Sequence, residues 1–296
     1  MAKYRIFTDS SSDLSSEQRK QFDIPYFRMG VSINGKEYHA DLDYQEYSVE
    51  QLYAWVGDIN NSCKTSLVSP EEFIEKMRPV LEAGEDILYL ACSGSLSSSV
   101  NVFKLVSKDL REEFPERKMF VVDACVAGFA LGLLAIDCKK KQDEGASIEE
   151  VLEFAEKEKQ KYNLLGTVAN LTYLRQAGRV SGAAAFFGNM MGVKPIIIED
   201  TAGRNYAFEK VNGRKKSLNR LIEIAKERID PERKEIYLGH GVCLEDVEYM
   251  KKRFEEELGA KVLIYPVGPI IGVSCGPGVI HVSFFGKEVT ITEPGK

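Results

Sequence analysis

Residues 87–122 read ILYLACSGSLSSSVNVFKLVSKDLREEFPERKMFVV, which predicts a strand, a serine-rich loop, a helix and a second strand. The apolar run at 87–91 has the length of a buried strand, and apolar residues recur at helical spacing from about 97 to 114. Residues 119–122 are apolar again. A strand, a crossover helix and a strand in this order are typical of a parallel sheet.

The same alternation extends through the first half of the chain. It predicts an α/β fold whose N-terminal domain, residues 1–162, contains a parallel sheet. Polar residues follow three of its strands, at 8–10, 93–95 and 123, and we expect them to share one edge of the sheet. The other predicted elements of this half are strands at 4–8 and 24–33 and helices at 15–22, 48–59, 70–81, 126–144 and 148–162.

The second half of the chain has a different pattern. Two strands flank Gly203 as in an antiparallel hairpin, so we expect a mixed or antiparallel α/β domain over residues 163–296. Its predicted strands lie at 164–168, 193–198, 206–211, 235–238, 261–265 and 279–291, and its helices at 172–177, 183–191, 217–228 and 244–257.

Composition restricts the class of protein. The 296 residues suggest two domains, and 44% hydrophobic with 28% charged residues is ordinary for a globular protein. A net charge of −6 argues against a nucleic-acid or anionic-membrane surface. We see neither a signal peptide nor a membrane-spanning run, and the six cysteines form no C-x-x-C pair. We therefore expect a cytoplasmic protein with reduced cysteines.

Motifs for metals and nucleotides are missing from the sequence. The three histidines lie far apart, and there is neither a Walker loop nor a complete G-x-G-x-x-G, so we expect no metal and no cofactor. Residues 272–276, GVSCG, match the G-x-S-x-G elbow of serine hydrolases with Ser274 as nucleophile. That elbow needs a helix directly after the serine, whereas Gly276-Pro277-Gly278 follows here. A hydrolase is the weaker alternative.

Three segments combine hydroxyl or guanidinium groups with helix ends. They are TSLVSP at 65–70, SGSLSSS at 93–99 and QAGRV at 176–180. A helix N-terminus presents unpaired amides and partial positive charge, which suits a carboxylate or phosphate. Each segment also has an ordinary explanation, respectively a helix cap, a solvated loop and a surface arginine.

A family resemblance extends over essentially the whole chain. TDSSSDL (8–14), TSLVSPEEF (65–73), SGSLSSS (93–99), LTYLRQAGRVSG (171–182), NMMGVKPII (189–197) and GPIIGVSCGPGVI (268–280) follow one another in order. In these motifs the chain resembles the DegV family. The resemblance implies a two-domain α/β protein that binds a long-chain fatty acid, such as palmitate or stearate, in an apolar tunnel. It also implies a non-catalytic role, in many bacteria as the binding subunit of an ATP-dependent fatty acid kinase.

The resemblance assigns roles to individual residues. Thr65 and Ser97 match hydroxyls that bind the carboxylate, and Arg179 matches an arginine at the mouth of the site. Ser98 and Ser274 are further candidates for the carboxylate site. Asp9 and Ser10 match a motif that we expect to organise the loops. The predicted tunnel wall consists of Phe186, Phe187, Met190, Met191, Ile196 and Ile198.

Two positions depart from the family pattern. Ser274 stands where the family usually has a histidine, and Asn212 where it usually has an arginine. Both changes remove positive or protonatable groups where phosphoryl transfer would use them. A stand-alone lipid carrier or sensor therefore remains an alternative to a kinase-coupled protein. A site for a phosphorylated metabolite is a third alternative, which the apolar segment 186–191 fits less well.

Overall fold

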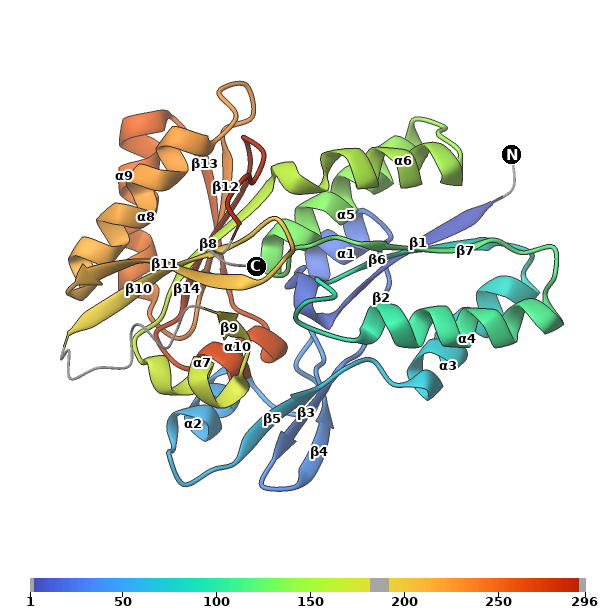
Figure 1. Cartoon of the computed structure of the whole chain (residues 1–296), viewed down its shortest axis with the longest axis horizontal. Coiled ribbons are helices and arrows are strands. Elements are labelled where there is room, and N and C mark those ends of the chain that lie inside the picture. The colour runs from blue at the N-terminus through green and yellow to red at the C-terminus, as the bar shows by residue number, and fades with distance from the viewer. Residues whose placement is uncertain (1–2, 182–191, 293–296) are drawn as a thin grey trace.

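The computed structural model describes residues 3–181 and 192–292. Its first half contains a four-stranded parallel sheet, which confirms the predicted N-terminal architecture (Figure 1). The strand order is β2-β1-β6-β7. These strands are β1 (Tyr4–Asp9), β2 (Tyr26–Phe27), β6 (Asp86–Ala91) and β7 (Met119–Asp123).

Helices pack against this sheet. Two begin as the sequence predicts, because Ser69 caps a helix with Pro70 at its first position and Ser15 forms a capping box with Gln18. The helices of this half are α1 (Ser16–Gln21), α2 (Val49–Gly57), α3 (Pro70–Glu82), α4 (Ser99–Glu113), α5 (Gly128–Asp143) and α6 (Ile148–Glu158), with short 3-10 turns η1 (Ser10–Ser12) and η2 (Lys159–Lys161).

The strand predicted at 24–33 is wrong, because the chain divides there between two sheets. After β2 it leaves the parallel sheet, and the Met29 amide donates to the Ser10 hydroxyl at 3.0 Å. It then enters an antiparallel sheet of order β4-β3-β5, formed by β3 (Gly30–Ile33), β4 (Lys36–His39) and β5 (Cys63–Ser66). Thr65 therefore lies on a strand rather than in a loop before α3.

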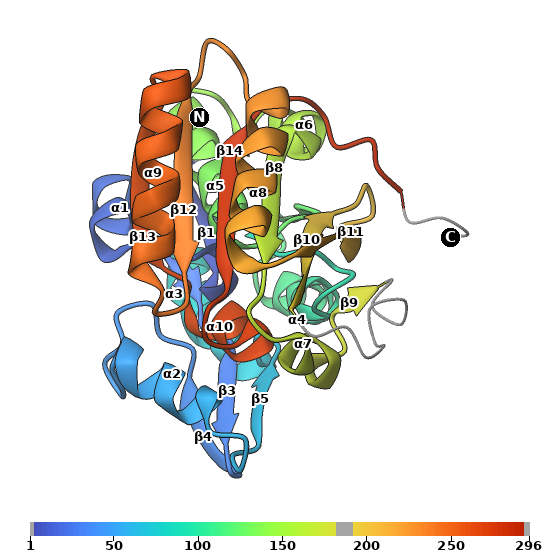
Figure 2. The same cartoon turned by 90° about the vertical axis from the view of Figure 1, so that its left-hand side faces the viewer.

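The second half forms a mixed sheet, as predicted, and it has seven strands, of which the short β9 was not predicted. Helices α8 (Arg214–Arg228) and α9 (Leu244–Leu258) cover the face seen in Figure 2, and α5 packs on the other face. The order is β13-β12-β14-β8-β10-β11-β9. Its strands are β8 (Tyr162–Thr167), β9 (Val180–Ser181), β10 (Val193–Glu199), β11 (Asn205–Asn212), β12 (Glu235–His240), β13 (Lys261–Pro266) and β14 (Ile280–Phe285).

Helix α5 joins the two halves. It contacts β1 and β6 of the parallel sheet and β8 and β14 of the mixed sheet, and its residues from Gly128 to Cys138 are buried. A helix that is apolar on all sides is typical of a position between two layers. The division into domains at residues 162 and 163 stays a prediction.

A second connection is made by α7 (Leu171–Ala177) and α10 (Pro269–Cys275). These helices contact each other, and α10 also contacts α2, β5 and η1 from the first half of the chain. The sequence analysis missed α10, although Pro269 at its first helical position is a recognised start signal. The strand expected at 279–291 ends at Phe285, and the helix expected at 183–191 lies outside the described residues.

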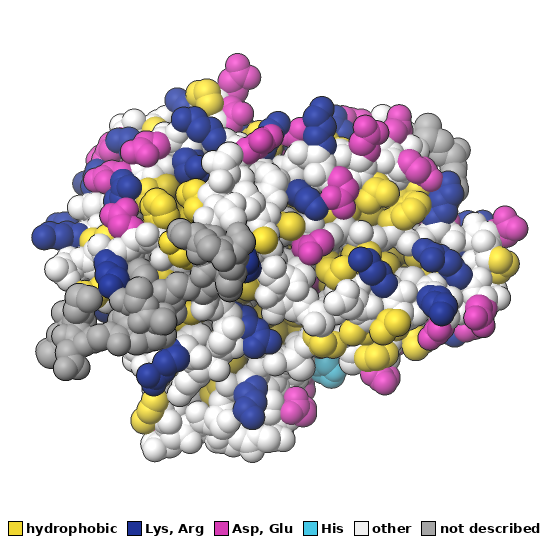
Figure 3. Space-filling model, viewed as in Figure 1, with side chains coloured by type: hydrophobic (Ala, Val, Ile, Leu, Met, Phe, Trp, Pro, Cys, Tyr) yellow, Lys and Arg dark blue, Asp and Glu magenta, His cyan; other side chains and the backbone are white. Residues whose placement is uncertain are grey.

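The distribution of charge on the surface and the length and polarity of the helices restrict the class of protein. Lys and Arg side chains intersperse with Asp and Glu over the face shown in Figure 3, in keeping with the modest net charge. Within residues 3–181 and 192–292, none of the helices has both the length and the apolar character that crossing a bilayer requires.

Candidate functional site

Three strands of the parallel sheet end at one edge, as predicted. The Asp9 carboxylate there accepts hydrogen bonds from the Ser11 amide (2.9 Å), the Tyr89 hydroxyl (2.7 Å) and the Cys92 amide (3.0 Å). The Asp123 carboxylate, at the end of β7, accepts from the Gly94 amide at 3.0 Å. These acceptors fix the loops after β1 and β6 relative to each other.

The loop after β6 leads into the N-terminus of α4. Ser98 is the N-cap residue, and its side chain makes no capping hydrogen bond. The Ser97 hydroxyl lies 2.9 Å from that of Ser99 and accepts from the Ser99 amide at 3.3 Å. Ser97 is half-buried and Ser98 is exposed, so a 15-residue helix directs its positive end and two hydroxyls to one place.

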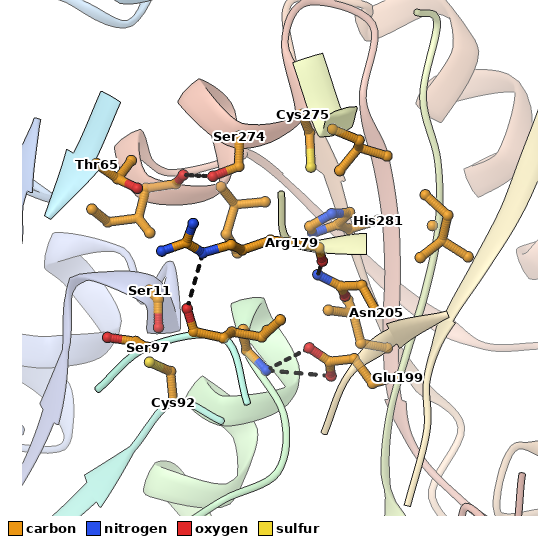
Figure 4. Close-up of a pocket in the computed structure, with 18 of the residues that line it drawn as sticks. Ser11, Thr65, Cys92, Ser97, Arg179, Glu199, Asn205, Ser274, Cys275 and His281 are labelled. Atoms are coloured by element: carbon orange, nitrogen blue, oxygen red, sulfur yellow. Dashed lines mark hydrogen bonds between the residues drawn. The ribbon is translucent and has the colours of Figure 1, made fainter. Parts of the chain in front are cut away.

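A cavity of about 350 Å³ lies beside this helix end, between the two halves of the chain (Figure 4). Its walls come from β5, the loop after β6, and strands β8, β10 and β14. Most of its lining side chains are apolar, as is usual for a small-molecule site. They are Met29, Leu67, Cys92, Leu96, Ala127, Leu164, Val168, Leu174, Ile197, Ile198, Ile270, Ile271, Cys275 and Val279.

The five residues predicted for carboxylate binding, which come from four separate segments, all line this cavity. They are Thr65, Ser97, Ser98, Arg179 and Ser274. In Figure 4 Thr65, Ser97 and Ser274 lie on the left of the cavity, and Arg179 extends between them. Their role in carboxylate binding stays a prediction.

Arg179 reaches the cavity from the end of α7. Gly178 terminates that helix in the left-handed region with a φ of 65°, a conformation that favours glycine. The Arg179 guanidinium donates to the carbonyls of Leu96 (3.3 Å) and Ala177 (2.7 Å). A guanidinium has five N–H donors, so these two bonds orient the group and leave donors for an anion.

A second cavity of about 240 Å³ adjoins the first. Three residues, Thr65, Arg179 and Ser274, line both cavities. The second cavity is more polar, and its other lining residues include Asp58, Asn61, Lys64 and Gln176. The three shared residues thus separate an apolar interior from a polar antechamber.

The predicted tunnel wall agrees with the lining only in part. Ile198 lines the cavity, whereas Ile196 packs in the core beneath α8 with Leu221 and Ile222. Ile197, which was not predicted, also lines the cavity. It packs in the core of the first half of the chain, whereas Ile198 packs in the same core as Ile196 and still reaches the cavity near the end of β10. Phe186, Phe187, Met190 and Met191 lie outside the described residues.

Six polar residues of the cavity were not predicted: Ser11, Ser66, Thr167, Glu199, Asn205 and His281. Glu199, Asn205 and His281 lie on β10, β11 and β14, on the right of Figure 4 and away from Thr65 and Ser97. The Glu199 carboxylate accepts from the Ala127 amide at the start of α5 at 3.1 and 3.3 Å. The sequence did contain a signal for Glu199 and His281, because each is a polar residue within the apolar run of a strand, β10 and β14 respectively.

Burial changes the protonation of two of these residues. It raises the pKa of Glu199 well above its ordinary value, and nearby Asp200 adds to the rise while the Ala127 amide opposes it. It lowers the pKa of His281 to about 4. In both residues the low-dielectric interior disfavours the charged form.

The geometry at Ser274 differs from that of a hydrolase. Ser274 lies in the last turn of α10, and its hydroxyl donates to the Ile270 carbonyl at 3.0 Å. A nucleophile elbow instead has its serine between a strand and a following helix. The motif at 272–276 therefore lacks the backbone geometry of that elbow.

Arg214 does not replace the arginine that the family usually has at position 212. Its guanidinium donates to Asp246 at 2.9 Å from Nε, on the outer face of the mixed sheet between α8 and α9. It is not among the lining residues of the cavity. Among the described residues there is also no group of three or more His, Cys, Asp or Glu side chains placed to hold a metal ion.

The fold and the cavity define an α/β protein with an internal apolar chamber that has hydroxyl groups and an arginine at one side. Residues 3–287 match the model of the DegV family, whose members are described as uncharacterised proteins. The chain is 33% identical to a DegV domain-containing protein of Clostridium perfringens, over 97% of this chain and 98% of that protein. The chain therefore belongs to the DegV family.

Two solved structures share the whole fold. One is a DegV lipid binding protein from Thermotoga maritima, with a TM-score of 0.84, 25% identity and coverage of 97% of this chain and 100% of that one. The other is a DegV family protein from Thermus thermophilus described for fatty acid binding, with a TM-score of 0.84, 27% identity and coverage of 96% and 100%.

Proposed function

We propose that this protein binds one long-chain fatty acid non-catalytically, with its carboxylate at Thr65, Ser97, Ser98, Arg179 and Ser274. One observation carries the proposal: an apolar cavity has hydroxyl groups, an arginine and a helix N-terminus together at one side. A molecule with an anionic head and a long apolar tail fits this division. The fatty acid binding described for the Thermus thermophilus relative supports the same ligand class.

The polar end accommodates the negative charge of the ligand. A carboxylate that leaves water needs several hydrogen bonds, because an unpaired buried charge is very costly. The hydroxyls, the first-turn amides of α4 and the remaining donors of Arg179 supply them. Among the described residues, no carboxylate lies within ion-pair distance of Arg179 and competes for it.

The apolar lining supplies most of the binding free energy. Each buried methylene contributes about 0.8 kcal/mol, so a sixteen-carbon chain gains on the order of 10 kcal/mol before ordering costs. We propose a chain of palmitate or stearate length, with Ile197 and Ile198 in its wall. Phe186, Phe187, Met190 and Met191 remain predicted parts of that wall.

The polar antechamber suggests how the head group is reached. Thr65, Arg179 and Ser274 line both cavities, so a carboxylate bound there is open to a reagent in the outer one. This arrangement favours a protein that presents its lipid to an ATP-dependent fatty acid kinase. The alternative is a stand-alone carrier, favoured by Ser274 in place of the usual histidine.

Lipid extraction tests the binding proposal directly. The protein is purified from a bacterial host, denatured in organic solvent and analysed by mass spectrometry for fatty acids. We expect one fatty acid per chain, or uptake of added palmitate at micromolar concentration. A protein that is empty and takes up neither palmitate nor stearate contradicts the proposal.

A second assay separates the two roles. The lipid-loaded protein is incubated with ATP and a fatty acid kinase subunit, and hydroxylamine trapping measures acyl phosphate. Formation of acyl phosphate supports presentation of the lipid to a kinase. If the kinase subunit produces acyl phosphate with another family member but none with this protein, the stand-alone carrier is supported.

A further inference from the structure

Away from the five residues predicted for carboxylate binding, the cavity has a second group of polar side chains. His281 is 6% exposed, lines the cavity, and its Nδ1 has no hydrogen-bond partner among the described residues. Glu199 is 4% exposed and lines the same cavity. Both residues lie across the cavity from Thr65 and Ser97, as Figure 4 shows. A purely apolar acyl chain would leave the imidazole of His281 without a hydrogen-bond partner, whereas the Glu199 carboxylate already accepts from the Ala127 amide.

The surroundings of His281 define the space beside it. It pairs with Gly166 on β8, and Gly166 pairs in turn with Ile197 on β10. Because Gly166 has no side chain, the imidazole lies directly over it: a methyl group at Gly166 would lie 3.3 Å from His281 Cδ2. A methyl group at Gly128 would lie 3.5 Å from both His281 Nδ1 and Ile271 Cδ1, so apolar and polar wall atoms meet here.

The chemistry of the two groups selects the partner. A buried imidazole is neutral, with one donor and one acceptor nitrogen, and a carboxyl whose neutral form is favoured has an O–H donor as well as acceptors. A hydroxyl group both donates and accepts, so it satisfies either tautomer of His281. A second carboxylate fits poorly, because Arg179 lies at the other end and burial disfavours charge on His281.

We infer that the preferred ligand is a long-chain fatty acid with a hydroxyl group on its acyl chain, and that His281 and Glu199 hydrogen-bond this hydroxyl. This inference rests on the fatty-acid-binding function proposed above and specifies its substrate class. Leaving a buried polar group unpaired is costly, so the imidazole of His281 discriminates against an unsubstituted chain, and Glu199 offers the hydroxyl a second partner.

Binding of matched ligands tests the inference. Dissociation constants are measured for stearate and for hydroxystearates with the hydroxyl near the carboxylate, at mid-chain and near the methyl end. We expect one positional isomer to bind about tenfold more tightly than stearate, the factor expected for one buried hydrogen bond. The isomer that is preferred locates the hydroxyl relative to the carboxylate site.

Two variants assign the preference to His281. His281→Leu should remove the preference for that isomer, and His281→Gln, whose amide donates and accepts, should retain part of it. Ile271→Val is the control, because it changes the same part of the wall without a polar group. It should alter the affinities for stearate and hydroxystearate by the same factor.

The outcomes separate this inference from the proposed function. If stearate binds and no hydroxystearate binds more tightly to the unaltered protein, the inference is wrong and the fatty-acid site stands. An unchanged preference in a folded His281→Leu protein also overturns it. If neither ligand binds, the proposed function itself fails. The comparison on the unaltered protein decides the question even where a variant does not fold.

Discussion

The Thr65 hydroxyl offers the sharpest test of the proposed carboxylate site. Thr65 lies on β5, is half-buried, and lines both the apolar cavity and the polar antechamber. Thr65→Val replaces the hydroxyl with a methyl group of similar size and keeps the β-branched shape that suits a strand. The variant therefore removes a hydrogen-bond donor with little change in packing.

The expected loss follows from the charge of the acceptor. A hydrogen bond to an ionised group contributes about 1.5–3 kcal/mol, or a factor of roughly 10 to 100 in affinity. Ser97 and the first-turn amides of α4 remain in the variant and share the carboxylate. We therefore expect stearate to bind about tenfold more weakly.

Calorimetric titration with two ligands measures this loss. Stearyl alcohol has the same chain without the charge, so Thr65→Val should weaken it by less than it weakens stearate. Thr201→Val is the matched control, because the Thr201 hydroxyl bonds to that of Thr292 at 2.9 Å and lines neither cavity. A folded Thr65→Val protein with unchanged stearate affinity would refute the carboxylate placement, and equal losses for both ligands would attribute the effect to packing.

Three further predictions follow from other positions. Ser274→His restores the usual family residue. Its imidazolium should make stearate bind about threefold more tightly at about pH 6 than at about pH 8. Binding titrations of the unaltered protein with stearate should show no such difference between the two pH values. The pKa of His281 falls to about 4 in the folded protein, so its contribution to stability is complete above the unfolded pKa of about 6.5 and is lost as pH falls through 4. Urea unfolding should show a loss of about 3 kcal/mol over that range, and a His281→Leu protein with the same acid sensitivity would contradict it. Gly203→Ala places a methyl group 2.7 Å from the Cys125 Cα atom at a φ of 71°, so the variant should lose about 2–4 kcal/mol of stability. Gly145→Ala is the control, because Gly145 also has a positive φ, 96°, but no atom lies within 4 Å of the added methyl group. It should lose about 1–2 kcal/mol. Equal losses in the two glycine variants would show that the contact at Cys125 costs nothing.

Local patterns were sufficient for much of the fold. Ser69 with Pro70 and Ser15 with Gln18 begin helices as predicted, because caps depend on neighbouring residues. The parallel sheet followed from apolar strands alternating with helices, and its shared polar edge followed from strand direction. The break at Arg28 and Met29 was missed, because a continuous apolar run does not reveal that its two ends join different sheets.

The sequence by itself determined the α/β class, the family and the segments that contribute hydroxyls and an arginine to the cavity. Only the tertiary structure decided which of those side chains share a wall, since Thr65, Ser97, Arg179 and Ser274 come from segments far apart in the chain. It also decided that Ile197, rather than Ile196, faces the cavity. The sequence could not show this, because both faces of the sheet are buried and apolar residues fill both. Glu199 and His281 acquired their altered pKa values in the same way, from burial that depends on contacts between the two halves of the molecule.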